Sequence, residues 1–174
     1  MKSSKNIVFL GMMGSGKSSI GFLVSKKLGL NFFDIDKHIE DKLNMKISNI
    51  FRLKGERFFR EYEEKITLDI LKKRQIVVSL GGGAFLNKKI RNEVLKSHIS
   101  FWLRLNSDII ISRIKNSAKR PMTLNMSNIE LKDMIKKRSI YYGKALLKIN
   151  CNNKTKTEIV NKIISLYENN QIIN

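Results

Sequence analysis

The segment that most constrains this chain is GMMGSGKSS, Gly11 to Ser19, which begins at the last residue of the apolar run NIVFLG. It fits the pattern G-x-x-x-x-G-K-[ST] without a mismatch, and it lies between an expected strand and an expected helix, as phosphate binding requires. Its glycines let successive backbone N–H groups face one anion, and the positive end of the following helix favours negative charge there. The sequence therefore predicts a nucleotide-binding loop that contacts ATP through Gly14, Ser15, Gly16, Lys17, Ser18 and Ser19.

Two side chains of this loop have separate expected roles. Lys17 would reach the β- and γ-phosphates, and Ser18 would ligate Mg²⁺. Such a loop occurs in kinases, switches, motors and nucleic-acid ATPases alike, so it does not identify the acceptor of the phosphoryl group. The other motifs of the chain have to decide that question.

Segments with the spacing of strands and of helices alternate along the chain. Strands are expected at residues 6–11, 30–36, 75–80, 98–105 and 145–149. Helices are expected at residues 17–28, at 38–64 with an interruption near Gly55, from Asp108 as N-cap, at 129–142 and from about Thr157. This alternation predicts an α/β fold in which a five-stranded parallel sheet carries helices on both faces and binds ligands at the carboxyl ends of its strands.

Length and composition predict a single domain over residues 1–174, because 174 residues with 42% hydrophobic content suffice for one well-buried core. The polar stretch KNSAKRPMTLNMS carries the only proline, Pro121, and is expected to be a mobile loop. The single cysteine, Cys151, excludes an internal disulfide framework. No N-terminal segment combines a basic start, an apolar stretch and a small-residue cleavage site, and no apolar run approaches bilayer length, so we expect neither a secretory leader nor a membrane span. We therefore expect a cytoplasmic monomer without a membrane partner.

The net charge of +19 raises the question of a nucleic-acid partner. The lysines are spread along the whole chain, with no long basic block and no basic strip interleaved with aromatic residues that could stack bases. We therefore expect no dedicated nucleic-acid partner. A charge of this size would still steer anionic small molecules toward a basic cleft.

Two aspartates, Asp34 and Asp36, stand two residues apart at the end of an expected strand. Side chains at this spacing project from the same edge of the sheet and can share one metal and phosphate neighbourhood. One carboxylate could hold the waters of Mg²⁺, and the other could face a substrate hydroxyl. An isolated aspartate in such a place is more often a helix cap. The interpretation of this pair as a functional site therefore depends on the other motifs of the chain.

Two further motifs point to an anionic acceptor. GERFFREYEE places Arg60 and Glu63 three residues apart on one helix face, where the carboxylate can fix the guanidinium for a planar anion. Taken alone, this spacing is more often a surface ion pair. SLGGGAF places Gly81, Gly82 and Gly83 at the end of the third expected strand, and three successive glycines indicate close approach of a ligand or a sharp turn.

Together these segments resemble the shikimate kinase family over nearly the whole chain. The matching segments are GMMGSGKS, FFDIDKHIE, IFRLKGERFFREYEE, VVSLGGGA, RPM within the polar stretch, and KKRSIYYGKA. Several independent motifs in the same order are far more specific than a phosphate-binding loop alone. The resemblance implies a P-loop kinase that converts shikimate and MgATP to 3-phosphoshikimate and ADP, a step toward chorismate and the aromatic amino acids.

The resemblance also implies roles for individual residues. In that family the first aspartate of the pair helps organise Mg²⁺ and the second binds shikimate hydroxyls, which implies Asp34 beside Ser18 at the metal and Asp36 at the substrate. It implies an acceptor-binding helical segment at about 37–64 and a mobile lid at about 115–128. The implied shikimate contacts are Asp36, Arg60, Gly82, Gly83 and Arg138.

The remaining implied residues contact the nucleotide. Arg120 matches the lid arginine that closes over the ATP phosphates, and with Lys17 and Asp36 it completes the implied catalytic set. Arg113 is similar to the residue that stacks on adenine, and the loop around Lys154 and Thr155 occupies the place of the second adenine contact.

Three features depart from the family pattern. Met122 replaces the usual leucine after the arginine and proline of the lid, Ile140 replaces a proline, and the NCNNKTKT loop lacks the common proline, which leaves the adenine contact least specified. The residues by themselves indicate a P-loop kinase of a small, anionic, hydroxylated acceptor. Another kinase of similar fold, such as a gluconate or nucleoside-monophosphate kinase, stays open as an alternative, as does a basic nucleic-acid-stimulated ATPase.

Overall fold

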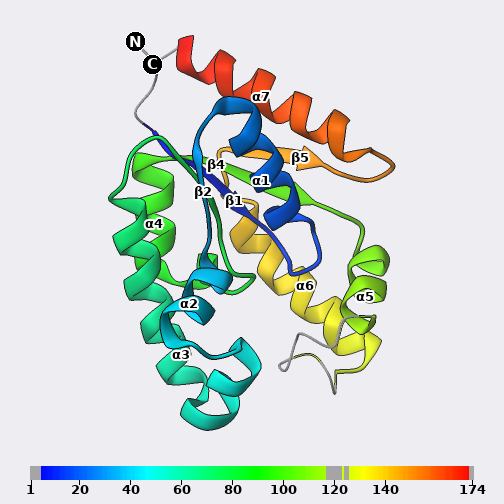
Figure 1. Cartoon of the computed structure of the whole chain (residues 1–174). Coiled ribbons are helices and arrows are strands. Elements are labelled where there is room, and N and C mark those ends of the chain that lie inside the picture. The colour runs from blue at the N-terminus through cyan, green and yellow to red at the C-terminus, as the bar shows by residue number, and fades with distance from the viewer. Residues whose placement is uncertain (1–4, 117–122, 124–125, 173–174) are drawn as a thin grey trace.

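Five parallel strands form the centre of the computed structural model, which describes residues 5–116, 123 and 126–172 (Figure 1). The strands are β1 (Ile7–Leu10), β2 (Asn31–Asp34), β3 (Ile76–Ser79), β4 (Ile99–Arg104) and β5 (Leu147–Asn150). Their order across the sheet is β2-β3-β1-β4-β5, and every pairing is parallel. The predicted five-stranded parallel sheet is confirmed.

Helices cover both faces of this sheet (Figure 1). On one face, α1 (Lys17–Leu28) and α7 (Lys156–Ile172) enclose a buried cluster with Ile7 and Phe9. On the other, α3 (Ile47–Leu71), α4 (Lys88–Ser97) and α6 (Asn128–Tyr142) enclose a cluster with Val8 and Leu10. Successive residues of β1 thus point into two different cores, which explains why its sequence is a continuous apolar run.

The shorter elements connect this framework to the carboxyl edge of the sheet. They are α2 (Ile35–Leu43), the 3₁₀ turn η1 (Ala84–Leu86) and α5 (Ser107–Lys115). Gly55 interrupts α3 with a φ of 82° and a ψ of 167°, as the sequence predicts, but the helix continues beyond the expected end at residue 64. Among the described residues, no helix combines the length and the apolar character that a bilayer span requires.

Two further predicted boundaries are wrong, and helix capping is the reason in both. The strand expected to run through Asp36 ends at Asp34, because the Asp34 carboxylate accepts a hydrogen bond from the Lys37 N–H (3.1 Å) and caps α2. Asp36 therefore lies in the first turn of α2. The N-cap of α5 is Asn106 and not Asp108, since the Asn106 side chain accepts a hydrogen bond from the Asp108 N–H (2.8 Å).

Candidate active site

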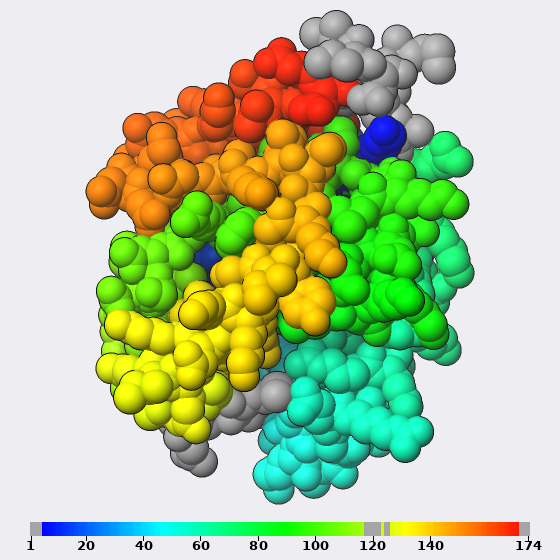
Figure 2. Space-filling model, turned by 180° about the vertical axis from the view of Figure 1, so that it is seen from behind, coloured from blue at the N-terminus to red at the C-terminus, as the bar shows by residue number. Residues whose placement is uncertain are grey.

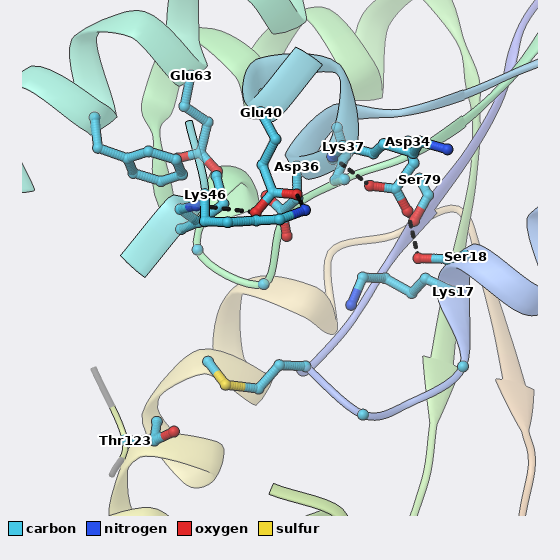
Figure 3. A pocket seen from close by; sticks show the side chains of 18 of the residues that line it. Lys17, Ser18, Asp34, Asp36, Lys37, Glu40, Lys46, Glu63, Ser79 and Thr123 are labelled. Carbon is cyan, nitrogen blue, oxygen red and sulfur yellow. Dashed lines mark hydrogen bonds and ion pairs between the residues drawn. The ribbon is translucent and has the colours of Figure 1, made fainter. Parts of the chain in front are cut away.

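The carboxyl ends of β1, β2 and β3 open into one cavity of about 730 Å³ (Figure 3). Its wall consists of the phosphate-binding loop, the start of α1, parts of α2 and α3, the glycines after β3 and part of α6. Most of the predicted site residues line it, namely Gly14, Gly16, Lys17, Ser18, Ser19, Asp34, Asp36, Arg60, Gly82, Gly83 and Arg138. The fold thus brings phosphate-binding and acceptor-binding candidates together across a single space.

The phosphate-binding loop is shaped by its glycines and closed by Lys17. Gly14 and Gly16 have φ values of 80° and 93°, in the left-handed region that residues with a side chain rarely adopt. Lys17 is only 7% exposed, and its Nζ donates to the carbonyl oxygens of Gly11 and Met12, each at 2.9 Å. The loop therefore holds the ammonium group at the cavity before any phosphate arrives.

Ser18 and Asp34 form the arrangement that best suits a metal ion. The Ser18 hydroxyl donates directly to the Asp34 carboxylate (Figure 3). A hydroxyl and a carboxylate are hard oxygen donors, and Mg²⁺ keeps most of its waters and takes only one or two protein ligands beside substrate phosphates. The described part of the chain contains no cluster of three His, Cys, Asp or Glu side chains that could hold a metal alone. The two residues fit Mg²⁺ shared with a nucleotide.

Arg60 and Glu63 form a partly buried ion pair at the acceptor side of the cavity. Arg60 Nη1 donates to Glu63 Oε2 at 2.7 Å, and the Glu63 side chain is 3% exposed. The Arg60 guanidinium also lies 5.1 Å from the centre of the Phe59 ring. The alternative of a surface ion pair is therefore wrong. Burial raises the pKa of Glu63, and the charges of Arg60 and Arg138 both oppose that rise, so the two guanidinium groups lie near the same carboxylate.

Asp36 and Glu63 both have raised pKa values. The pKa of Asp36 is raised to about 7, first by its desolvated position and then by the negative charges of Glu63 and Asp34, against the lowering effect of Lys17 and Arg60. Burial raises the pKa of Glu63 in the same way, although Arg60 opposes it. Asp36 is accessible from the cavity, and a carboxyl group with a pKa near neutrality can exchange a proton with a bound hydroxyl.

The glycine run after β3 makes room for these charged groups. A β-carbon at Gly81 would lie 2.6 Å from Glu63 Oε1 and 2.7 Å from Asp36 Oδ1. One at Gly83 would lie 2.6 Å from a guanidinium nitrogen of Arg60. Distances this short exclude a side chain unless the neighbours move. The sequence predicted that a ligand or a sharp turn explains these glycines. Part of the reason is that the side chains of Asp36, Arg60 and Glu63 lie close to the backbone there.

Sequence reasoning missed a contact between α6 and the middle glycine. The hydroxyl of Tyr142 donates to the Gly82 carbonyl, and Arg138 Nη1 approaches the same oxygen at 3.5 Å. Tyr142 is 1% exposed, and its burial raises its pKa to about 12, which keeps it protonated as a donor. The available signal was its spacing of four from Arg138, which places both on one face of a helix.

Two of the predicted adenine contacts lie together, outside this cavity. Arg113, near the end of α5, donates from Nη1 to the carbonyl of Gly14 at 2.8 Å, so it reaches the back of the phosphate-binding loop. Burial raises the pKa of the Cys151 thiol to about 11, while Arg113 and Lys154 both lower it. The two cations therefore lie on the same side of the molecule, near Cys151.

The other predicted ATP-binding residues either make contacts within the protein or lie outside the residues that the structure describes. The Thr155 hydroxyl accepts a hydrogen bond from the Glu158 N–H (3.2 Å) and donates to the Glu158 carboxylate (2.6 Å), so its side chain caps α7. The Ser15 hydroxyl is buried in the loop, without a hydrogen-bond partner among the described residues. Arg120 and Met122 lie outside the described residues, as does most of the expected lid at 115–128.

Comparison with known proteins decides the family. The family model described as shikimate kinase matches residues 13–168. This chain belongs to the shikimate kinase family. A curated member, the shikimate kinase of Sulfurihydrogenibium sp., is 39% identical over 161 residues, which cover 92% of this chain and 96% of that protein.

Solved structures agree with membership of the shikimate kinase family. A shikimate kinase from Acinetobacter baumannii, solved in complex with shikimate, superposes with a TM-score of 0.91 at 28% identity and covers 98% of this chain and 96% of its own. A gluconokinase from Sinorhizobium meliloti reaches a TM-score of 0.59 at 16% identity, covering 98% of this chain and 95% of its own. That second likeness shows a shared fold alone, so the gluconate kinase alternative is not favoured.

Proposed function

We propose that this chain transfers the γ-phosphoryl group of ATP to a hydroxyl of shikimate, giving 3-phosphoshikimate and ADP. The observation that carries this proposal is the single cavity in which a phosphate-binding loop faces two arginines and a carboxyl group, in a member of the shikimate kinase family. Phosphoryl transfer needs positioning and neutralisation of charge more than covalent chemistry. The roles of the individual residues follow from that requirement.

On the phosphate side, Lys17 is the residue that contacts the transferring group. Its ammonium group is held at the cavity by two carbonyls of the loop, so ATP can exchange those contacts for phosphate oxygens without a large movement. Ser18 and Asp34 would hold Mg²⁺. A bound Mg²⁺ would supply positive charge that neutralises the charge developing on the phosphates. Arg120, on a mobile lid at about 115–128, is proposed to close over the same phosphates and exclude water.

On the acceptor side, Arg60 and Arg138 are proposed to bind the shikimate carboxylate. Glu63 holds the Arg60 guanidinium in place at 2.7 Å, and the Tyr142 contact holds the Gly82 carbonyl beside Arg138. Both arginines belong to helices α3 and α6, which are fixed by the core. An acceptor without a carboxylate would leave both guanidinium groups without their partner in a desolvated site. Uncharged sugars and nucleosides should therefore be poor acceptors.

Asp36 is proposed to bind the hydroxyl groups of the acceptor and to take the proton of the reacting one. It lines the cavity together with Lys17 and Ser18, and its pKa of about 7 suits proton transfer near neutral pH. The helical segment at about 37–64 would then carry most of the acceptor contacts. Arg113 and the loop at Lys154 and Thr155 are proposed to flank adenine, within one domain that acts as a monomer without a nucleic-acid partner.

The direct test is ADP release with a panel of acceptors. Shikimate should stimulate ADP release from MgATP strongly, whereas gluconate and nucleoside monophosphates should leave it at the level without acceptor. DNA or RNA should have no effect. Stimulation by gluconate or by nucleic acid, with none by shikimate, would overturn the proposed function in favour of the corresponding alternative.

Arg138→Ala should weaken the use of shikimate while leaving ATP binding nearly unchanged. Removing one partner of a desolvated charge pair costs about 2–5 kcal/mol, so kcat/KM for shikimate should fall roughly 30-fold or more. Steady-state kinetics with shikimate and ATP varied separately measure both effects. Lys137→Ala is the matched control, because Lys137 precedes Arg138 on α6 but is exposed and lies outside the cavity. A loss of ATP affinity with normal shikimate affinity would contradict the assignment.

Gly83→Ala should displace the Arg60 guanidinium without unfolding the protein. The three atoms nearest to the added methyl group would all belong to the flexible end of the Arg60 side chain, which can move. We expect the KM for shikimate to rise roughly tenfold, which corresponds to about 1.4 kcal/mol, with the melting temperature nearly unchanged. Kinetics and a thermal melt on the same sample measure the two quantities. A normal KM would show that Arg60 need not hold its present position.

A further inference from the structure

A second cavity of about 450 Å³ lies behind the phosphate-binding loop. Figure 2, which shows the molecule from behind, displays a hollow between the green atoms of β4 and the yellow and orange atoms of α6 and β5, with dark blue atoms of the early chain at its base. We call it the rear cavity. Its lining includes Met12, Trp102, Arg104, Asn106, Asn150 and Asn152, and no described residue lines both this cavity and the active-site cavity.

The lining of the rear cavity favours an anion. Among the described residues, Arg104 is the only charged one that lines this cavity, and none of the others forms an ion pair with it. The Arg104 guanidinium lies 6.0 Å from the centre of the Trp102 ring. The lining therefore offers one positive charge beside one aromatic surface, with no carboxylate to repel an anion. A volume of this size is within the range that small-molecule sites occupy.

The rim of the rear cavity is held by hydrogen bonds between amide groups. The Asn152 side-chain oxygen accepts from the Asn106 N–H at 2.8 Å. The Asn152 side-chain NH₂ in turn donates to the Asn150 side-chain oxygen at 2.8 Å. These contacts connect the end of β5 to the start of α5. The rim is thus built before any ligand binds, which reduces the entropy that binding would cost.

The rear cavity is in direct contact with the backbone that holds Lys17. A β-carbon at Gly11 would lie 3.3 Å from Trp102 Cδ1, so the indole packs against the first glycine of the phosphate-binding loop. Met12, the next residue, lines the rear cavity itself. The carbonyls of Gly11 and Met12 are the two groups that accept hydrogen bonds from Lys17. A molecule resting on Trp102 and Met12 would therefore contact the other side of the nucleotide cradle.

We propose that the rear cavity binds a small anion with a flat apolar face, with Arg104 contacting the charge and Trp102 contacting the face. We further propose that occupancy of the rear cavity and nucleotide binding at the loop alter one another's affinity. Such coupling is reciprocal by thermodynamic necessity. The binding step does not depend on the acceptor being shikimate, so it can be tested without turnover.

Trp102 provides a direct readout, because it is the only tryptophan in the chain and gives a single indole N–H signal by NMR. The probes are benzoate, which is flat and anionic, benzamide, which is flat and neutral, and acetate, which is anionic without a ring. Benzoate should shift the indole signal saturably in the millimolar range, as is ordinary for so small a ligand. Benzamide and acetate should bind at least about tenfold more weakly, since each lacks one of the two contacts.

Arg104→Met should weaken benzoate binding at least about tenfold by removing the charge-assisted contact. Arg74→Met is the matched control: it makes the same change at an exposed residue just before β3, at the opposite edge of the sheet, and should leave binding unchanged. No saturable shift in the wild type, or an equal shift in Arg104→Met, would overturn the proposed site. Because Arg104 lies outside the active-site cavity, turnover of Arg104→Met without benzoate should stay within about twofold of the wild type.

The coupling is tested by repeating the benzoate titration with saturating MgADP. The benzoate dissociation constant should change by at least about fivefold, and the MgADP dissociation constant should change by the same factor with benzoate present. Equal affinities in the two titrations would overturn the coupling. Failure of shikimate to stimulate ADP release would overturn the proposed function and leave the rear-cavity result standing, so the two outcomes are distinguishable.

Discussion

Lys17→Ala is expected to lower kcat by at least about 1,000-fold while the fold stays intact, because the variant loses a charge-assisted contact to the transferring phosphoryl group. Lys17 is nearly buried, and the carbonyls of Gly11 and Met12 accept hydrogen bonds from its ammonium group. The measurement is steady-state ADP release with shikimate, together with a thermal melt of the same sample.

The control for Lys17→Ala is Lys26→Ala, which makes the same change on an exposed position of the same helix and should leave turnover unchanged. It separates the effect of the phosphate contact from that of losing one positive charge. A folded Lys17→Ala protein with near-normal turnover would contradict the assignment of the loop. A Lys17→Ala protein that fails to fold should be replaced by Lys17→Met, which keeps the buried apolar stem.

Asp36→Asn is expected to lower kcat by about 100-fold and to change the KM for shikimate much less. Asparagine keeps the shape and one accepting oxygen, so it can still bind a hydroxyl. It cannot take the proton of that hydroxyl. It also removes a negative charge that lies near the negative charges of Glu63 and Asp34. Kinetics with shikimate varied at saturating MgATP separate the two parameters.

Asp41→Asn is the matched control for Asp36→Asn, because Asp41 lies on the same helix and lines the same cavity but has no proposed role in proton transfer. It should leave kcat within about twofold of the wild type. If Asp36→Asn turns over normally, the proton acceptor lies elsewhere. If its KM rises and its kcat does not fall, Asp36 acts only in binding.

Much of the framework could be predicted because it depends on contiguous residues. The phosphate-binding loop is a local pattern, and α1 begins and ends where its spacing and its flanking glycines indicate. The apolar runs of β1, β3 and β4 predict strands buried on both faces, as the structure has them. The position of Asp36 could not be predicted in this way. Residues 30–36 read as a strand, but the side chain of Asp34 caps a helix one residue later.

The character of the acceptor site depended on packing between distant segments. The spacing of Arg60 and Glu63 fits a surface ion pair as well as a buried one, and only the packing of α3 against the core decides that Glu63 is buried. The same holds for Gly81, whose neighbours Asp36 and Glu63 come from two other elements. A glycine run indicates that something approaches closely, without indicating what.

The sequence by itself determined the order of strands and helices, the nucleotide-binding loop, and the resemblance that led to the family, since each depends on residues that are neighbours along the chain. Only the tertiary structure decided that Asp36 has a pKa of about 7, that Tyr142 donates a hydrogen bond to Gly82, and that Trp102 packs against the phosphate-binding loop beside the rear cavity. Desolvation and contact between distant residues depend on how the whole chain packs. No local pattern of residues encodes those distances.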